Sequence, residues 1–200
     1  MNWADLGTDA ETYLALAASA LAIGAIAGIA LGVAASHAAF ARTPILLLTN
    51  IGRAVPSIAL LTFMLPILGL GFIPALAALA VLATAPIAIT TDLAFRGVPA
   101  AAIDAARGMG MTPAQILRRV EWPLAFPVIF AGVRTAATEV VASAVLAAFI
   151  GAGGLGELIT TGLQANQPER LWAGVITIAC IALCAEFALA FAQRRLGEVA

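Results

Sequence analysis

The sequence predicts an all-α integral membrane protein, formed as a single transmembrane domain over residues 1–200 with about five membrane-spanning helices. Hydrophobic residues make up 62% of the chain and charged residues only 10%, whereas soluble domains carry roughly 45–50% apolar and about 25% charged residues. The apolar residues also form blocks of the roughly 20 residues that a helix needs to cross a bilayer. These observations exclude a soluble enzyme, a disordered chain and a nucleic-acid-binding protein.

Five blocks are apolar and long enough to be predicted as membrane spans. Their approximate bounds are residues 13–35, 54–72, 74–92, 124–149 and 171–192. The second and third blocks contain several prolines, so we expect kinked or broken helices there. Such breaks are tolerated in a membrane only where protein or a water-filled cavity satisfies the freed backbone groups. The first block follows acidic rather than basic residues, so it is predicted to be a retained span and not a secretory signal.

The arginines predict the orientation of the chain. All ten basic residues are arginines, and eight lie in three segments that share one side of the membrane: 36–53, 93–123 and the tail after 192. Because cytoplasmic loops are enriched in Lys and Arg, the N-terminus is predicted outside and the C-terminus inside. Aromatic rings favour membrane interfaces, and three stand at predicted span ends: Tyr13, Trp122 and Trp172.

Glycines form two patterns, a regular stripe along the first span and a dense cluster after the fourth. Gly24, Gly28 and Gly32 repeat along one face of the first span. Helices in lipid associate by close backbone approach, so this face is predicted to pack on another helix, of the same chain or of a second copy. Residues 151–156 match a dinucleotide-binding pattern, but that site needs a preceding strand and a later acid. A sharp turn or a close approach to another helix is predicted there instead.

Residues 93–123 are predicted to form a cytoplasmic helix–Gly–helix excursion. Ala100 to Arg107 are strong helix formers, and Gly110 follows them. Thr112 is suited to cap a second short helix, which is expected to end at the membrane before Pro123. The residues alone leave two alternatives open, a solvated connector or a segment that docks on a partner.

Ionisable residues inside the predicted spans are candidates for the translocation pathway. Arg134 lies ~15 Å into the fourth span, near mid-bilayer, where a charge usually faces a cavity or a partner. Glu139 is about 140° around the helix from Arg134, so direct pairing is not expected. Glu186 in the fifth span is a second candidate partner. A structural pair and a pore-lining group remain alternatives for Arg134, and Glu139 is equally open.

Other reactive residues are predicted to be structural. Asp92 and Arg96 are expected to pair at i and i+4. His37 is predicted to be a solvated loop residue. The two cysteines, Cys180 and Cys184, are expected to pack as small apolar side chains and not to form a disulfide or metal site. No metal or other cofactor is predicted.

The 93–123 segment contains a motif with defined spacing. Asp104-Ala105-Ala106 is followed after three residues by Gly110 and after nine more by Val120-Glu121-Trp122-Pro123. This arrangement resembles the EAA loop of bacterial ABC importer permeases, whose pattern is E-A-A, three residues, G, nine residues, I-x-L-P. The spacing matches throughout, with Asp for Glu, Val for Ile and Trp for Leu. Residues 53–57 and 149–156 are similar to osmoprotectant permeases in particular, although methionine permeases share a similar glycine segment.

This resemblance implies the permease subunit of an ABC importer in the bacterial inner membrane. Such a subunit is expected to move a quaternary-ammonium osmoprotectant, such as glycine betaine or choline, into the cell by alternating access. It implies docking of the EAA loop on a pair of cytoplasmic ATPase subunits, a second permease subunit, and an external binding protein. The chain itself is not expected to be an enzyme. The docking residues implied are Asp104, Ala105, Ala106, Gly110 and Pro123, and the pathway candidates are Arg134, Glu139, Pro56 and Ser57.

Two alternative functions follow from the same residues. One is a methionine-type permease. The other is an ion-coupled secondary carrier with Arg134, Glu139 and Glu186 as its midplane charges. Inverted repeats would favour the carrier, and none is visible in the sequence.

Overall fold

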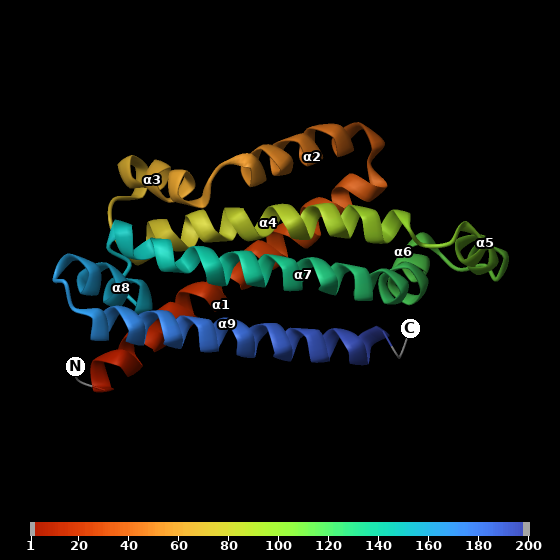
Figure 1. The fold of residues 1–200 in the computed structure, drawn as a ribbon. Helices are drawn as coiled ribbons and strands as arrows, with labels where there is room; N and C mark the ends of the chain where they lie inside the picture. Colours follow the sequence, from red (N-terminus) through yellow and green to blue (C-terminus); the bar gives the residue numbers. More distant parts are fainter. Residues whose placement is uncertain (1–2, 198–200) are drawn as a thin grey trace.

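The computed structural model describes residues 3–197, and this range is helical without any strand. Four long helices, α1 (Trp3–His37), α4 (Phe72–Arg96), α7 (Trp122–Ala144) and α9 (Pro168–Gly197), form an elongated bundle (Figure 1). The shorter elements are α2 (Ala39–Ala54), α3 (Ser57–Leu68), α5 (Ala100–Gly108), α6 (Pro113–Ile116), a π-helical turn η1 (Leu117–Glu121), a 3₁₀ segment η2 (Val145–Ile150) and α8 (Leu155–Gln164). The all-α prediction is therefore confirmed.

Four helical segments of the described chain are long and apolar enough to cross a membrane. Their bounds are Leu6–His37, Phe72–Arg96, Pro113–Ile150 and Pro168–Arg195. The bent pair formed by α2 and α3 makes a fifth if it counts as one broken span, with 101° between its halves. With this pair included, the number of spans agrees with the sequence prediction of about five.

Helix α2 is the main departure from the predicted boundaries, because residues 36–53 were assigned to a loop. The sequence of this helix does not resemble a membrane span, because it contains polar and helix-breaking residues: Arg42, Pro44, Asn50 and Gly52. The residue before a proline is restricted to extended conformations, and Val55 before Pro56 has φ −74° and ψ 125°. The helix therefore ends there, and the predicted span 54–72 contains only α3 and the turn after it.

The second departure lies at the start of α7. The helix begun at Thr112 was expected to stop before Pro123, yet the chain continues through η1 into α7. The Trp122 N–H donates to the Leu117 carbonyl, five residues back, so the turn is widened. A proline ring clashes with the carbonyl four residues earlier in a regular helix, and the wide turn stands directly ahead of Pro123.

Close contact between α1 and α4 forms the centre of the bundle. A Cβ added at Gly24, Gly28 or Gly32 would lie 2.4, 2.8 and 2.4 Å from the Cβ of Ala83, Ile87 and Thr91, respectively. Only glycine permits these backbones to approach so closely. The glycine face of the first span therefore packs on a helix of the same chain, as one of the two predicted alternatives.

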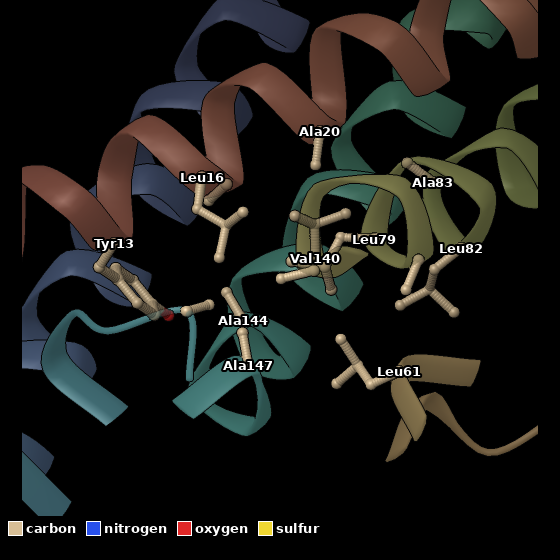
Figure 2. Packing of buried hydrophobic residues seen from close by; sticks show 14 of the residues in the cluster. Tyr13, Leu16, Ala20, Leu61, Leu79, Leu82, Ala83, Val140, Ala144 and Ala147 are labelled. Atoms are coloured by element: carbon tan, nitrogen blue, oxygen red, sulfur yellow. The ribbon is translucent and has the colours of Figure 1, made fainter. Parts of the chain in front are cut away.

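The buried cluster joins α1, α3, α4, α7 and η2, as Figure 2 shows around Leu16, Leu79 and Val140. Tyr13 belongs to this cluster, with only 2% of its surface exposed. Its hydroxyl donates a hydrogen bond to the Val141 carbonyl at 2.5 Å. The prediction that Tyr13 is an interfacial anchor is wrong, because α1 begins ten residues earlier than its apolar block suggests. Trp172 is 60% exposed.

The two ends of the bundle carry different short elements. Helices α5 and α6 lie at the same end as the C-terminal end of α9, whereas α8 lies at the opposite end with the start of α1 (Figure 1). The glycine segment forms the predicted turn before α8, with positive φ at Gly151, Gly153 and Gly154. A Cβ at Gly156 would lie 2.3 Å from the Val145 carbonyl oxygen, so α8 packs back against η2.

Candidate functional site

A polar cleft of about 410 Å³ opens between α7 and α9. All of its lining residues except one alanine carry a polar or charged side chain. They are Ala131, Arg134, Thr135, Thr138, Glu139, Glu186 and Gln193. Two of the four predicted pathway residues, Arg134 and Glu139, therefore line one cavity.

Arg134 is the centre of a hydrogen-bonded network that joins α7 to α9. Its Nε donates to Glu186 Oε1 at 3.1 Å, and its Nη1 donates to Gln193 Oε1 at 2.8 Å. The hydroxyl of Thr138 donates to Glu186 Oε2 at 3.2 Å. The pairing of Arg134 with Glu186 matches the sequence prediction. The network engages both carboxylate oxygens of Glu186, so Arg134 and Glu186 join α7 to α9.

Glu139 has a different environment in the same cleft. Its Oε1 lies 3.8 Å from Nη2 of Arg53, which reaches across from the end of α2. Its Oε2 is buried and has no hydrogen-bond partner among the described residues. Sequence reasoning missed Arg53 because residues 36–53 were taken as a cytoplasmic loop. Its position three residues before Pro56 was the available signal, since a helix tends to end before a proline and Arg53 then lies in its last turn.

Pro56 and Ser57 mark the break between α2 and α3 and do not line the cleft. The Pro56 carbonyl accepts hydrogen bonds from the N–H groups of Ala59 and Leu60, at 2.9 and 3.1 Å, and so begins α3. Their link to the cleft runs through Arg53, which precedes them in the chain. The structure thus brings Arg134 and Glu139 together and leaves Pro56 and Ser57 as the bend that positions Arg53.

The predicted docking segment is a small, exposed unit at the end of the bundle. Gly110 has φ +74°, and a Cβ built on it would meet nothing within 4 Å. Its requirement for glycine is therefore conformational and not one of space. Thr112 and Gln115 form a reciprocal capping box at the start of α6. These features agree with the predicted helix–Gly–helix arrangement.

The individual docking residues differ in exposure. Asp104 and Ala105 are exposed, whereas Ala106 is 1% exposed and packs inward. Met109, directly before the glycine, is 69% exposed. Pro123 lies at the start of α7 and is exposed there.

Two of the predictions for ionisable side chains require correction. Asp92 is 1% exposed and bonds to Arg42 of α2 at 3.1 Å, not to Arg96, so it ties the broken span to α4. His37 is the last residue of α1, and its Nε2 lies 3.1 Å from Glu121 Oε2 in η1.

The cysteines also differ from expectation. Cys180 and Cys184 are both free and exposed on α9, so they do not pack in the core as small apolar side chains. The described residues contain no cluster of three or more His, Cys, Asp or Glu side chains that could hold a metal ion.

Comparison with known proteins identifies the family. Residues 20–198 match the family described as the binding-protein-dependent transport system inner membrane component. The chain belongs to this family. It is 38% identical over 184 residues to the choline transport system permease protein of Bacillus subtilis (strain 168), with 92% of this chain and 85% of that protein covered. It is 36% identical over 183 residues to the glycine betaine/carnitine/choline transport system permease protein of the same organism, with 92% and 84% covered.

Solved structures agree with this assignment. The methionine ABC transporter MetNI in an inward-facing conformation has a TM-score of 0.84 and 26% identity, and the match covers 96% of this chain and 95% of that one. The protein is therefore an inner-membrane permease of an ABC importer and not an ion-coupled carrier. The sequence prediction on both points is confirmed.

Proposed function

We propose that this chain is the permease subunit of an ATP-driven importer for small quaternary-ammonium osmoprotectants such as choline, glycine betaine or carnitine. The observation that carries this proposal is the 36–38% identity, over 92% of the chain, to permeases named for these compounds. The identity to the methionine transporter is 26%. Hence the osmoprotectant assignment is favoured over the methionine-type alternative.

The partners follow from the same proposal. A second permease subunit completes the pore, because one chain of five spans supplies half of the path in transporters of this class. A pair of cytoplasmic ATPase subunits hydrolyses ATP, and an external binding protein delivers the substrate. Few aromatic side chains are present in the chain, 6% of residues, and tight quaternary-ammonium sites rely on aromatic faces. High-affinity selection of the substrate is therefore assigned to the binding protein.

The substrate class is tested by uptake into proteoliposomes that contain the permease with its ATPase and binding protein. Labelled choline, glycine betaine and carnitine are supplied with ATP, and methionine serves as the comparison. Accumulation of at least one quaternary ammonium is the expected result. Accumulation of methionine alone would overturn the substrate assignment.

We further infer that α5, Gly110 and α6 dock on the ATPase. The segment is exposed, and it lies at the end of the bundle where the C-terminal end of α9 also lies (Figure 1). Seven of the ten arginines belong to this end, namely Arg42, Arg96, Arg107, Arg118, Arg119, Arg194 and Arg195. The positive-inside rule supports a cytoplasmic location for it.

Replacing Gly110 by alanine tests the docking segment. Gly110 has φ +74°, and an L-residue in this conformation costs about 1–2 kcal/mol. A roughly tenfold fall in substrate-stimulated ATP hydrolysis of the reconstituted complex is expected. Gly7→Ala is the matched control, because Gly7 lies in α1, outside the docking segment, with ordinary helical geometry and open space around it. Equal stimulation in both variants would remove the docking assignment.

The orientation of the chain is tested by thiol labelling. Ala101 in α5 and Ala165 directly after α8 are both exposed, and these two helices lie at opposite ends of the bundle (Figure 1). Single cysteines at these positions, in a chain lacking Cys180 and Cys184, should react from opposite sides of the membrane. An impermeant reagent added to intact cells is expected to label position 165 first. Labelling of position 101 first would place α5 outside.

A further inference from the structure

The cleft between α7 and α9 is suited in size and polarity to a small charged molecule. Its volume of about 410 Å³ lies within the roughly 300–1,000 Å³ typical of small-molecule sites. No aromatic side chain lines it, so a cation entering the cleft cannot be held by aromatic faces. Recognition of a positive charge there must come from a carboxylate.

Two carboxylates line the cleft, and only one is available. Glu186 uses both oxygens, since Oε1 accepts from Arg134 and Oε2 accepts from Thr138. Glu139 has one oxygen 3.8 Å from Arg53 and the other without a hydrogen-bond donor in the described part of the chain. Buried acceptors without donors are rare and indicate a missing counterpart. A quaternary ammonium carries no N–H and pairs with a carboxylate through charge alone, so it can replace the charge of Arg53 beside Glu139.

Arg53 is held weakly in its pair with Glu139. The separation of 3.8 Å is longer than that of a charge-assisted hydrogen bond, ~2.7–2.9 Å, and the Arg53 side chain is 52% exposed. Arg134, the cation that lines the cleft, bonds to two partners, Glu186 and Gln193, whereas Arg53 reaches the cleft only through Glu139. Arg53 is therefore the cation that a competing positive charge can displace.

We propose that Glu139 binds the quaternary-ammonium group of the substrate during its passage and that Arg53, released from Glu139, binds the substrate's carboxylate. The proposal rests on the proposed function for the substrate class. Glycine betaine and carnitine carry both charges, so each end meets an opposite charge and the site stays neutral. Choline carries only the cation, and it leaves Arg53 without a carboxylate. Arg53 therefore distinguishes zwitterionic from purely cationic substrates.

The test measures maximal uptake rates in proteoliposomes containing the complete complex. Glu139→Gln removes the cation partner and keeps the shape of the side chain. Its maximal rates for all three substrates should fall about tenfold, the change that corresponds to one weak ion pair. Arg53→Gln should lower the rates for glycine betaine and carnitine while sparing choline. Glu169→Gln, at an exposed carboxylate outside the cleft, is the matched control and should transport at the wild-type rate.

The double variant separates a binding site from a purely structural pair. If Glu139 and Arg53 only hold α2 against α7, removing both charges should restore uptake, because no buried charge is left unpaired. If they bind substrate, the double variant should remain as slow as Glu139→Gln. Restored uptake, wild-type rates in Glu139→Gln, or an Arg53→Gln defect equal for all three substrates would each overturn the proposal.

Two further outcomes concern the assembly of the variant and the proposed function itself. If the Glu139 variant does not assemble into the complex, as judged by gel filtration, the substrate pattern of Arg53→Gln alone decides. If the wild-type complex transports none of the three quaternary ammoniums, the proposed function has failed, and not the assignment of Glu139.

Discussion

Helices α4 and α9 are both long and apolar, yet they differ in how much of each is buried and in the contacts that hold each one in the bundle. In the most apolar 18-residue window of each helix, 61% of α4 is buried inside the chain and none of α9. The backbone of α4 approaches α1 at three glycines and α7 at Gly132, where an added Cβ would overlap Thr90. By contrast, α9 is joined to α7 by the Arg134 network. Lipid supplies no hydrophobic drive between helices. We therefore expect a rigid centre around α4 and an outer helix α9 that is held to α7 by polar pairs and to α8 by close packing at Gly174.

The largest effect is expected from closing the α1–α4 contact. Gly24→Ala places a Cβ 2.4 Å from the Cβ of Ala83 and 2.9 Å from the Ala80 carbonyl oxygen, and such overpacking typically costs about 1–3 kcal/mol. The matched control is Gly52→Ala in α2, where nothing lies within 4 Å and alanine should stabilise the helix by roughly 0.5–1 kcal/mol. Thermal unfolding in detergent measures both. Similar melting temperatures for the two variants would contradict the idea of a rigid centre.

A smaller loss is expected from a single polar contact inside that centre. Tyr13→Phe removes the hydrogen bond from α1 to the Val141 carbonyl and keeps the ring. A loss of about 1 kcal/mol is expected, the usual contribution of one hydrogen bond. Trp172→Phe serves as the control, because Trp172 is 60% exposed. The same unfolding assay measures both variants, and an unchanged stability for Tyr13→Phe would show that the hydroxyl has no structural role.

The smallest change in melting temperature is expected at the outer helix. Glu186→Gln weakens the link between α7 and α9, and both side chains of the pair are about one third exposed, 34% and 37%. Melting should shift less than for Gly24→Ala, while limited proteolysis at the α8–α9 turn should become faster as α9 separates. Glu169→Gln is the control at an exposed carboxylate. A loss of stability as large as that of Gly24→Ala would place α9 within the rigid centre.

The sequence predicted the structure correctly where short-range patterns determine the local conformation or packing. The glycine spacing of the first span, the cap at Thr112 and the turn at Gly110 are short-range signals, and the structure shows each of them. The mid-membrane position of Arg134 required a partner, and Glu186 was among the candidates. These predictions needed only periodicity, caps and the energetic cost of a charge in lipid.

The failures arose where contacts between distant residues override local patterns. The residue type and position of Tyr13 predict an interfacial anchor. Its ring instead packs in the buried cluster, and its hydroxyl donates a hydrogen bond to the carbonyl of Val141, 128 residues further along the chain. Asp92 had a suitable local partner in Arg96, but α2 brings Arg42 to it. Helix α2 itself was the missing element, and without it neither Arg42 nor Arg53 could be placed. One undetected helix therefore accounts for two of the missed ion pairs.

The bend between α2 and α3 also constrains how the chain enters the membrane during synthesis. Helix α2 has 16 residues and α3 has 12, which correspond to lengths of about 24 and 18 Å, shorter than the ~30 Å hydrocarbon core. Neither half is long enough to be released into lipid as an independent span. We expect this segment to wait at the insertion machinery until α4 has emerged from the ribosome, and to leave together with it as a hairpin. The order in which the helices are synthesised is thus part of what makes a broken span possible.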